Sequence, residues 1–275
     1  MKKVYIAIIA GVVGLGIIAG LFLTPKNKSD GDSALELAPL VKADKAFSNQ
    51  QLLEAKALYK SAMESIEDAG KLKEVQAKIE EINTSIILSP IIDACSAEYE
   101  VKPGDALVKI ARKFKTTVNL IKRANNLTSD TIRPAQLLKV NTCQFSIVVD
   151  KSQNLLFLKR KGEVIKTYTV STGKDNSTPT GTFYINKDKL VNPTWYKTGA
   201  IIPPDSSENI LGSRWMGLGG IDSAGVEMEG YGIHGTNQPN DLGKQITLGC
   251  VRMRNADVEE IFDIVPVGTE VIIID

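Results

Sequence analysis

The feature that most limits how this chain can fold is an uncharged apolar run near its N-terminus. Val4–Leu23 contains no charged residue and follows Lys2 and Lys3. As a helix this run is about 30 Å long, enough to span the hydrocarbon core of a bilayer. It ends in bulky residues and lacks a small-residue cleavage site, which favours an uncleaved anchor over a cleaved signal peptide or a buried core helix. Residues 1–24 are therefore predicted to be a membrane anchor.

The bulk composition excludes several classes of protein. A net charge of +1 over 275 residues gives no sign of a nucleic-acid partner. The three cysteines and the single histidine form no C-x-x-C or H-x-x-H pair, so a common structural zinc site is excluded and no metal or cofactor is expected. An odd number of cysteines in an exported protein suggests one disulfide and one free thiol.

The segment after the anchor is polar and then helical. Residues 25–34 have the composition of a flexible linker. Residues 35–90 are predicted to form a helical hairpin: one amphipathic helix over 50–66, with Asn49 as its N-cap, and a second over 72–86. The hairpin resembles a single tetratricopeptide-like unit. Both a spacer and a protein-docking surface remain open as its role.

Residues 97–142 are predicted to form a small α+β unit of order βααβ. Its two helices lie between short strands at 99–102 and 137–141, with Asp105 expected to cap the first helix and Thr116 or Thr117 the second. This order, together with the motif Tyr99-x-Val101-x-x-Gly104-Asp105, resembles a LysM module. The resemblance implies binding of glycans that contain N-acetylglucosamine, such as peptidoglycan.

Cys95 and Cys143 lie just outside the two strands of this module. If the strands pair antiparallel, the two cysteines are neighbours, and a bond between them would stabilise the module by about 3–4 kcal/mol. Such a bond needs an oxidising compartment. The alternative is that both are unpaired, small, buried residues.

Residues 145–275 are rich in short β-branched and aromatic runs separated by Gly, Pro, Asn and Asp. One helix is expected at 256–264, with Asn255 as its cap. These features predict a mainly β domain, a sandwich or a barrel. The whole chain is thus expected to have one transmembrane helix, a helical hairpin, a small α+β module and this β domain.

The only histidine and the third cysteine lie in two glycine-containing segments of this domain. A cysteine nucleophile needs a base or a positive neighbour, which His234 offers to Cys250. Gly249 permits a tight turn that aims backbone N–H groups at an oxyanion, and Arg252 offers a cation for a substrate carboxylate. A lone histidine or cysteine is more often an ordinary packed residue, so the spacing alone leaves catalysis open.

The segments His234-Gly-Thr-Asn and Thr247-x-Gly-Cys-Val-Arg-Met253 resemble the signature of the YkuD-type L,D-transpeptidase catalytic domain. Ser171-Thr-Gly173 and Thr178–Phe183 extend the resemblance, while Leu248 stands where many members have histidine. The resemblance implies a peptidoglycan L,D-transpeptidase that forms 3→3 cross-links through a Cys250 thioester.

The same resemblance assigns roles to individual residues. It implies catalytic roles for Cys250, His234, Gly235 and Gly249: the Gly235 carbonyl orients the His234 ring, and the N–H groups of Gly249 and Cys250 hold the oxyanion. Arg252, Thr247 and Tyr231 are expected to bind substrate.

The expected partners are peptidoglycan strands and stem peptides, carbapenem inhibitors, and a membrane reached through the anchor, with the folded domains outside the cytoplasm. Two alternative functions remain. An L,D-carboxypeptidase would use the same acyl donor, and a non-catalytic anchor protein would only bind peptidoglycan.

Overall fold

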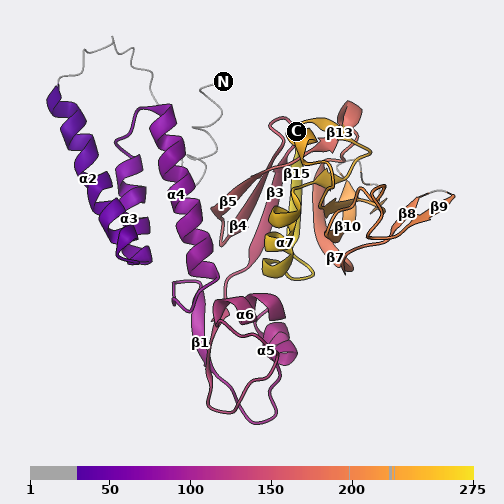
Figure 1. Ribbon diagram of the computed structural model, residues 1–275, viewed down its shortest axis with the longest axis horizontal. Helices are drawn as coiled ribbons and strands as arrows, with labels where there is room; N and C mark the ends of the chain where they lie inside the picture. Colours follow the sequence, from indigo (N-terminus) through magenta and orange to yellow (C-terminus); the bar gives the residue numbers. More distant parts are fainter. Residues whose placement is uncertain (1–29, 198, 223–224, 226) are drawn as a thin grey trace. The chain divides into compact units, whose positions relative to one another are not determined.

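A computed structural model describes residues 30–197, 199–222, 225 and 227–275 (Figure 1). The anchor predicted over residues 1–24 lies outside these described residues. Within them, no helix combines the length and the apolar character needed to cross a bilayer. The chain divides into two compact units, Met1–Ile82 and Asn83–Asp275, which are described separately below.

In its described part, the first unit has an additional helix before the two of the predicted hairpin. Its described part holds α2 (Asp30–Ser48) and α3 (Leu52–Met63), and α4 (Ala69–Ile87) begins within it. Asn49 does not cap α3, because the chain turns after α2 and places Gln51 at the N-cap without a side-chain bond.

A polar cluster ties these three helices together. Tyr59 of α3 is fully buried, and its hydroxyl donates to Asp44 of α2, which also pairs with Lys78 of α4. Burial of the tyrosine ring therefore comes with a partner for its hydroxyl, as a buried polar group requires.

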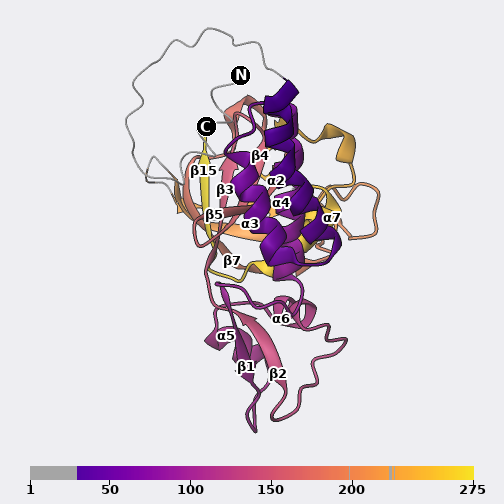
Figure 2. The same cartoon turned by 90° about the vertical axis from the view of Figure 1, so that its left-hand side faces the viewer.

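The predicted βααβ unit is present at the start of the second unit (Figure 2). β1 (Ser96–Glu100) pairs antiparallel with β2 (Leu137–Asn141), and α5 (Leu107–Lys113) and α6 (Val118–Ala124) lie between them in sequence. Buried aliphatic side chains from α5, α6 and β2, together with Val101 just after β1, form its core.

The two predicted helix caps of this module have different outcomes. Thr117 caps α6, its hydroxyl accepting from the Leu120 N–H at 2.8 Å. The prediction for Asp105 is wrong. Ala106 is the N-cap of α5, and the Asp105 carboxylate accepts instead from the Lys102 N–H and the Tyr99 hydroxyl. Asp105 therefore closes the turn that follows β1 rather than the helix.

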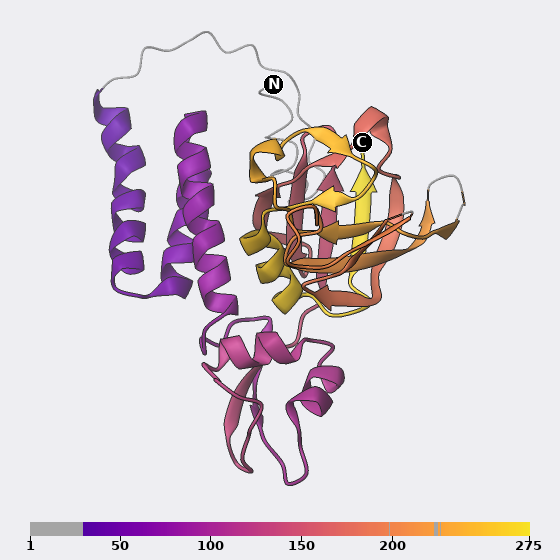
Figure 3. The same ribbon diagram turned by 45° about the vertical axis from the view of Figure 1, so that its right-hand side comes forward.

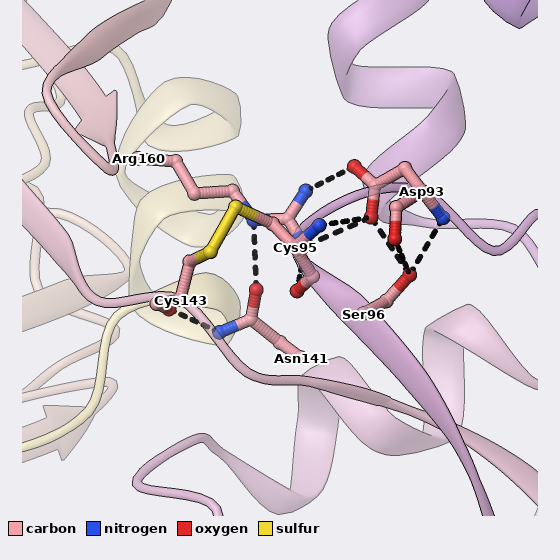
Figure 4. The surroundings of a disulfide bond; sticks show 6 residues. All are labelled: Asp93, Cys95, Ser96, Asn141, Cys143 and Arg160. Carbon is pink, nitrogen blue, oxygen red and sulfur yellow. Dashed lines mark hydrogen bonds and ion pairs between the residues drawn. A yellow bond between two sulfur atoms is a disulfide. The ribbon is translucent and has the colours of Figure 1, made fainter.

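The predicted disulfide between Cys95 and Cys143 is confirmed, with Cα atoms 5.0 Å apart (Figure 4). Arg160, at the end of β4 (Leu155–Arg160), lies against it. Its guanidinium donates to the Cys95 carbonyl at 2.6 Å, to Asn141 Oδ1 at 2.8 Å and to the Asp93 carboxylate at 2.7 Å. The side chain of Arg160 is only 4% exposed, so these contacts compensate the burial of its charge.

Removing this disulfide is expected to destabilise the protein. The bond joins residues 48 apart, and opening a loop of that length restores chain entropy worth about 3–4 kcal/mol to the unfolded state. Guanidinium unfolding of Cys95→Ser/Cys143→Ser should therefore show a lower free energy of unfolding than the oxidised wild-type protein. The reduced wild-type protein is the control and should match the double variant. Equal stability of oxidised and reduced protein would contradict this expectation.

The rest of the second unit is a curled sheet with a helix packed on it (Figure 3). Among the described residues the sheet has nine strands. Eight of them pair in the order β14-β12-β10-β7-β15-β3-β4-β5, and the ninth, β11, pairs with the end of β10. The bounds of these strands not given elsewhere are β3 (Phe145–Asp150), β5 (Glu163–Thr169), β7 (Gly181–Val191), β10 (Arg214–Asp222), β11 (Glu227–Met228), β12 (Gly232–His234), β14 (Val251–Arg252) and β15 (Glu270–Ile274). The sheet and α7 (Asn255–Ile264) enclose one apolar core, so the predicted mainly β domain is confirmed.

Two small strand pairs flank the main sheet. β6 (Thr172–Gly173) pairs parallel with β13 (Gln245–Thr247). β8 (Trp195–Lys197) and β9 (Ala200–Ile202) form a hairpin that extends beyond the sheet in Figure 1. The base of this hairpin is fixed by Asn209, which is buried and whose amide donates to the Pro193 carbonyl at 2.9 Å.

The predicted N-cap of the C-terminal helix is wrong. α7 begins at Asn255 itself, and Arg254 occupies the N-cap without a side-chain bond. The Asn255 side chain contacts other segments, described below.

Candidate active site

Strand pairing brings together residues that are far apart in the sequence. β12 and β14 are parallel neighbours, with Ile233 opposite Val251 and His234 opposite Arg252. Cys250 immediately precedes β14. A cavity of about 520 Å³ is lined by His234, Cys250 and Arg252 together. Parallel pairing therefore places the predicted nucleophile, base and cation in one cavity.

His234 is buried and held on two sides. Its Nδ1 lies 2.6 Å from the Gly235 carbonyl, the contact that the sequence resemblance implies. Because a carbonyl only accepts, Nδ1 carries the proton, which leaves Nε2 of the neutral ring as an acceptor. The Trp215 ring stacks on the other side, with centroids 5.7 Å apart. Burial lowers the pKa of His234 to about 4, so the ring is neutral at pH 7.

Cys250 is the free cysteine of the chain. Burial raises the pKa of its thiol, while the Gly232 backbone and the Arg252 charge act in the opposite direction. With the pKa of the thiol raised and that of the imidazole lowered, the resting pair is a neutral thiol and a neutral base. Both groups are neutral because burial disfavours their charged forms.

A tight turn precedes the thiol. Thr247 is buried, and its hydroxyl donates to the Cys250 carbonyl at 2.7 Å and accepts from the Gly249 N–H at 3.2 Å. Gly249 has a φ of +127°, and a Cβ there would lie 2.6 Å from Tyr231 Cε1. Both facts require glycine at this position. Because its N–H already has a partner, Gly249 shapes the turn rather than offering a free oxyanion donor.

Arg252 is 6% exposed and is positioned by its backbone, which exchanges two hydrogen bonds of 2.8 Å with Ser171. Its Nε is buried and has no hydrogen-bond partner among the described residues. Burial lowers the pKa of Arg252, and the Asp241 charge raises it. A buried guanidinium nitrogen without a partner, beside a cavity, is suited to an anionic group of a ligand.

The cavity also has aromatic walls that the sequence did not single out. Trp195, Tyr196 and Trp215 line it, as do the predicted substrate-binding residues Tyr231 and Thr247. Trp215 lies opposite His234 across the β10–β12 pair, and a Cβ on Gly232 would lie 2.6 Å from its ring. The sequence gives little indication of this contact, because the strand pairing that brings Trp215 and Gly232 together is not visible in it.

The depressed pKa of His234 predicts a pH-dependent stability. The unfolded state takes up the proton below a pKa of about 6.5, but the folded state does so only near 4. The stabilising contribution is therefore present above pH 6.5 and is lost as the pH falls towards 4, by about 3 kcal/mol.

Urea unfolding of wild type and His234→Gln over pH 4–7 isolates this effect, because carboxyl titration is common to both proteins. The wild-type curve should fall more steeply with acidification. Parallel curves would show that His234 titrates normally.

Comparisons with known proteins agree with this architecture. The model of the L,D-transpeptidase catalytic domain (YkuD) matches residues 144–273, and that of the LysM domain matches residues 99–141. A putative L,D-transpeptidase, YqjB of Bacillus subtilis, is 40% identical over 130 residues, covering 47% of this chain and 70% of that protein. The chain therefore belongs to the YkuD L,D-transpeptidase family.

Two further similarities are found among known proteins. The putative L,D-transpeptidase YkuD of Bacillus licheniformis is 33% identical over 181 residues, covering 63% of this chain and 96% of that protein. Among solved structures, an L,D-transpeptidase from Mycobacterium smegmatis is 19% identical, with a TM-score of 0.37, and covers 51% of this chain and 64% of its own.

Proposed function

We propose that this protein is a peptidoglycan L,D-transpeptidase that forms 3→3 cross-links through a Cys250 thioester. The observation that carries the proposal is the pairing of β12 with β14, which places His234, Cys250 and Arg252 around one cavity. A thiol and a neutral imidazole that line the same cavity are suited to acyl transfer. A buried cation with an unpartnered Nε is suited to a stem-peptide carboxylate.

In the first step, Cys250 Sγ attacks the carbonyl carbon of the third stem residue. The thiol proton passes to His234 Nε2, and an N–H group such as that of Cys250 stabilises the oxyanion. The bond to the terminal D-Ala nitrogen then breaks. His234 returns the proton to that leaving amine, and a thioester remains on Cys250.

In the second step, the side-chain amine of a neighbouring stem attacks the thioester carbonyl. His234 takes a proton from this amine and gives it to the departing Cys250 thiolate. A new amide bond joins the two stems, and the free thiol is restored. Arg252 stays outside the proton transfer and holds a carboxylate of the donor stem.

The remaining parts of the chain fit this function. The LysM domain holds the enzyme on glycan strands and raises the local concentration of stem peptides. Residues 1–24 anchor the protein to a membrane, with the domains outside the cytoplasm. The Cys95–Cys143 disulfide supports an oxidising, extracytoplasmic location.

The experiment is incubation of the protein with defined disaccharide-tetrapeptides, followed by mass spectrometry of the products. A dimer that has lost one D-Ala and carries a 3→3 bond is expected. Tripeptide without dimer would instead identify an L,D-carboxypeptidase, in which water resolves the same thioester. Unchanged tetrapeptide, with binding to peptidoglycan retained, would identify a non-catalytic anchor protein and overturn the proposal.

A further inference from the structure

We propose that Asn255 is a positioning residue that holds the His234 ring in its working orientation through the Gly235–Thr236 peptide. The proposal rests on the proposed roles of His234 and Cys250. Asn255 lies at the start of α7, and its side chain contacts neither of those residues in the described hydrogen bonds. It acts on the backbone that holds the histidine.

The Asn255 amide oxygen accepts from two segments. Its Oδ1 lies 3.0 Å from the Thr236 N–H, just after β12, and 3.1 Å from the Ser213 N–H, just before β10. The backbone of two glycines packs closely against this oxygen. A Cβ placed on either Gly212 or Gly235 would lie 2.2 Å from it. The glycines on both segments therefore leave room for this one acceptor.

The link from Asn255 to the histidine is a single rigid plane. The N–H of Thr236 and the carbonyl of Gly235 belong to the same peptide group, which is planar and trans. Fixing the N–H at Asn255 therefore fixes the direction of the carbonyl, which lies 2.6 Å from His234 Nδ1. A hydrogen bond on the N–H also polarises the carbonyl and makes it a better acceptor.

The hydrogen bond from the Ser213 N–H to Asn255 also bears on the His234 ring. Ser213 lies two residues after Leu211, whose backbone works with Gly235 to raise the pKa of His234 against the effect of burial. Leu211 and His234 line the same cavity. By bonding both Ser213 and Thr236, Asn255 connects the two backbone segments that face the imidazole.

Helix capping does not account for the asparagine. Asn255 is the first residue of α7, the N-cap is Arg254, and no side chain accepts from the first turn of this helix at the cap. Asn255 is itself exposed, so losing it removes little buried surface. Its replacement is therefore expected to change the reaction more than the fold.

The test measures the rate at which a carbapenem acylates Cys250 as a function of pH, with the intact mass of the protein as the readout. With a neutral His234 base, wild-type acylation should be nearly constant from pH 6 to 8. His234→Ala must rely on free thiolate, so its rate should rise with pH. In Asn255→Ala, acylation should be about ten- to a hundredfold slower, which is the effect of two lost hydrogen bonds. Its rate should also rise with pH, as in His234→Ala. Asn255→Asp keeps the acceptor oxygen and should retain the flat profile.

Two further variants complete the design. Arg254→Ala changes the adjacent exposed position without touching the two N–H groups, and should match wild type. Should Asn255→Ala fail to fold, Asn255→Gln gives the same comparison, because it displaces the amide oxygen by one methylene.

The outcomes separate this inference from the proposed function. A flat profile for Asn255→Ala beside a rising one for His234→Ala would overturn the positioning role alone. Equal loss in Asn255→Ala and Asn255→Asp would also overturn it, since the acceptor oxygen would then be irrelevant. A flat profile in His234→Ala would remove the base from the proposed mechanism, and this inference with it.

Discussion

Replacing Cys250 with alanine is expected to abolish both cross-linking and formation of any covalent acyl-enzyme. Cys250 is the only free cysteine, because Cys95 and Cys143 are bonded to each other. No other thiol can therefore take over the attack. A carbapenem presents a strained amide carbonyl and a carboxylate, so the thiol can attack the first while Arg252 binds the second. Intact mass should show a one-drug adduct on wild type, mapped to Cys250, and none on Cys250→Ala.

The control for this prediction is a variant that keeps the cavity but has no free thiol. Cys250→Ser conserves size and polarity and should also give no adduct, because a serine hydroxyl is a far weaker nucleophile at neutral pH. Residual cross-linking by Cys250→Ala would show that the nucleophile lies elsewhere. A wild-type enzyme that is active on muropeptides but takes no carbapenem would point to a narrower donor site.

Replacing His234 with alanine is expected to slow acylation by about 10²–10⁴-fold at pH 7, the usual contribution of a general base. The thiol then has no imidazole to take its proton, because its described acceptor, the Gly230 carbonyl at 3.9 Å, is not a base, and partial burial raises the pKa of the thiol. Rapid-mixing measurements of acylation, with intact mass as the readout, give the rate directly. Raising the pH should recover part of the lost rate, because hydroxide then deprotonates the thiol.

Trp215→Phe provides a matched control for the histidine experiment. It changes the aromatic side chain that stacks on the ring at 5.7 Å, but leaves the Nδ1 bond to Gly235 in place. Its effect on acylation should be much smaller than that of His234→Ala. Comparable losses in the two variants would mean that packing around the imidazole, rather than its basicity, limits the reaction.

The sequence predicted the parts of the molecule that rest on local patterns. The LysM strands, a helix cap at Thr116 or Thr117 and the mainly β domain were all visible as alternation, turn residues and capping signals. The disulfide followed because antiparallel pairing makes the flanking residues neighbours. His234 and Cys250 were found through two short motifs, which carry glycine next to each reactive side chain, whereas the aromatic walls of the cavity were not.

What the sequence could not supply depends on contacts between distant segments. Asp105 and Asn255 were both predicted as caps, because a short polar residue before a helix satisfies that pattern. Their oxygens instead accept from other backbone groups, and only the folded chain shows which. The neutral state of the Cys250–His234 pair is likewise a result of burial, which motif spacing does not record.

The parallel pairing of β12 with β14 also bears on how this domain can be altered. Its register, not the length of the intervening chain, sets the positions of the histidine and the thiol. The exposed stretch around Gln238 and Asn240 lies between them in sequence and forms no part of either strand. Insertions there lengthen a surface loop at little cost in closure entropy. This stretch is thus a natural place for a reporter tag or a grafted recognition peptide in a working enzyme.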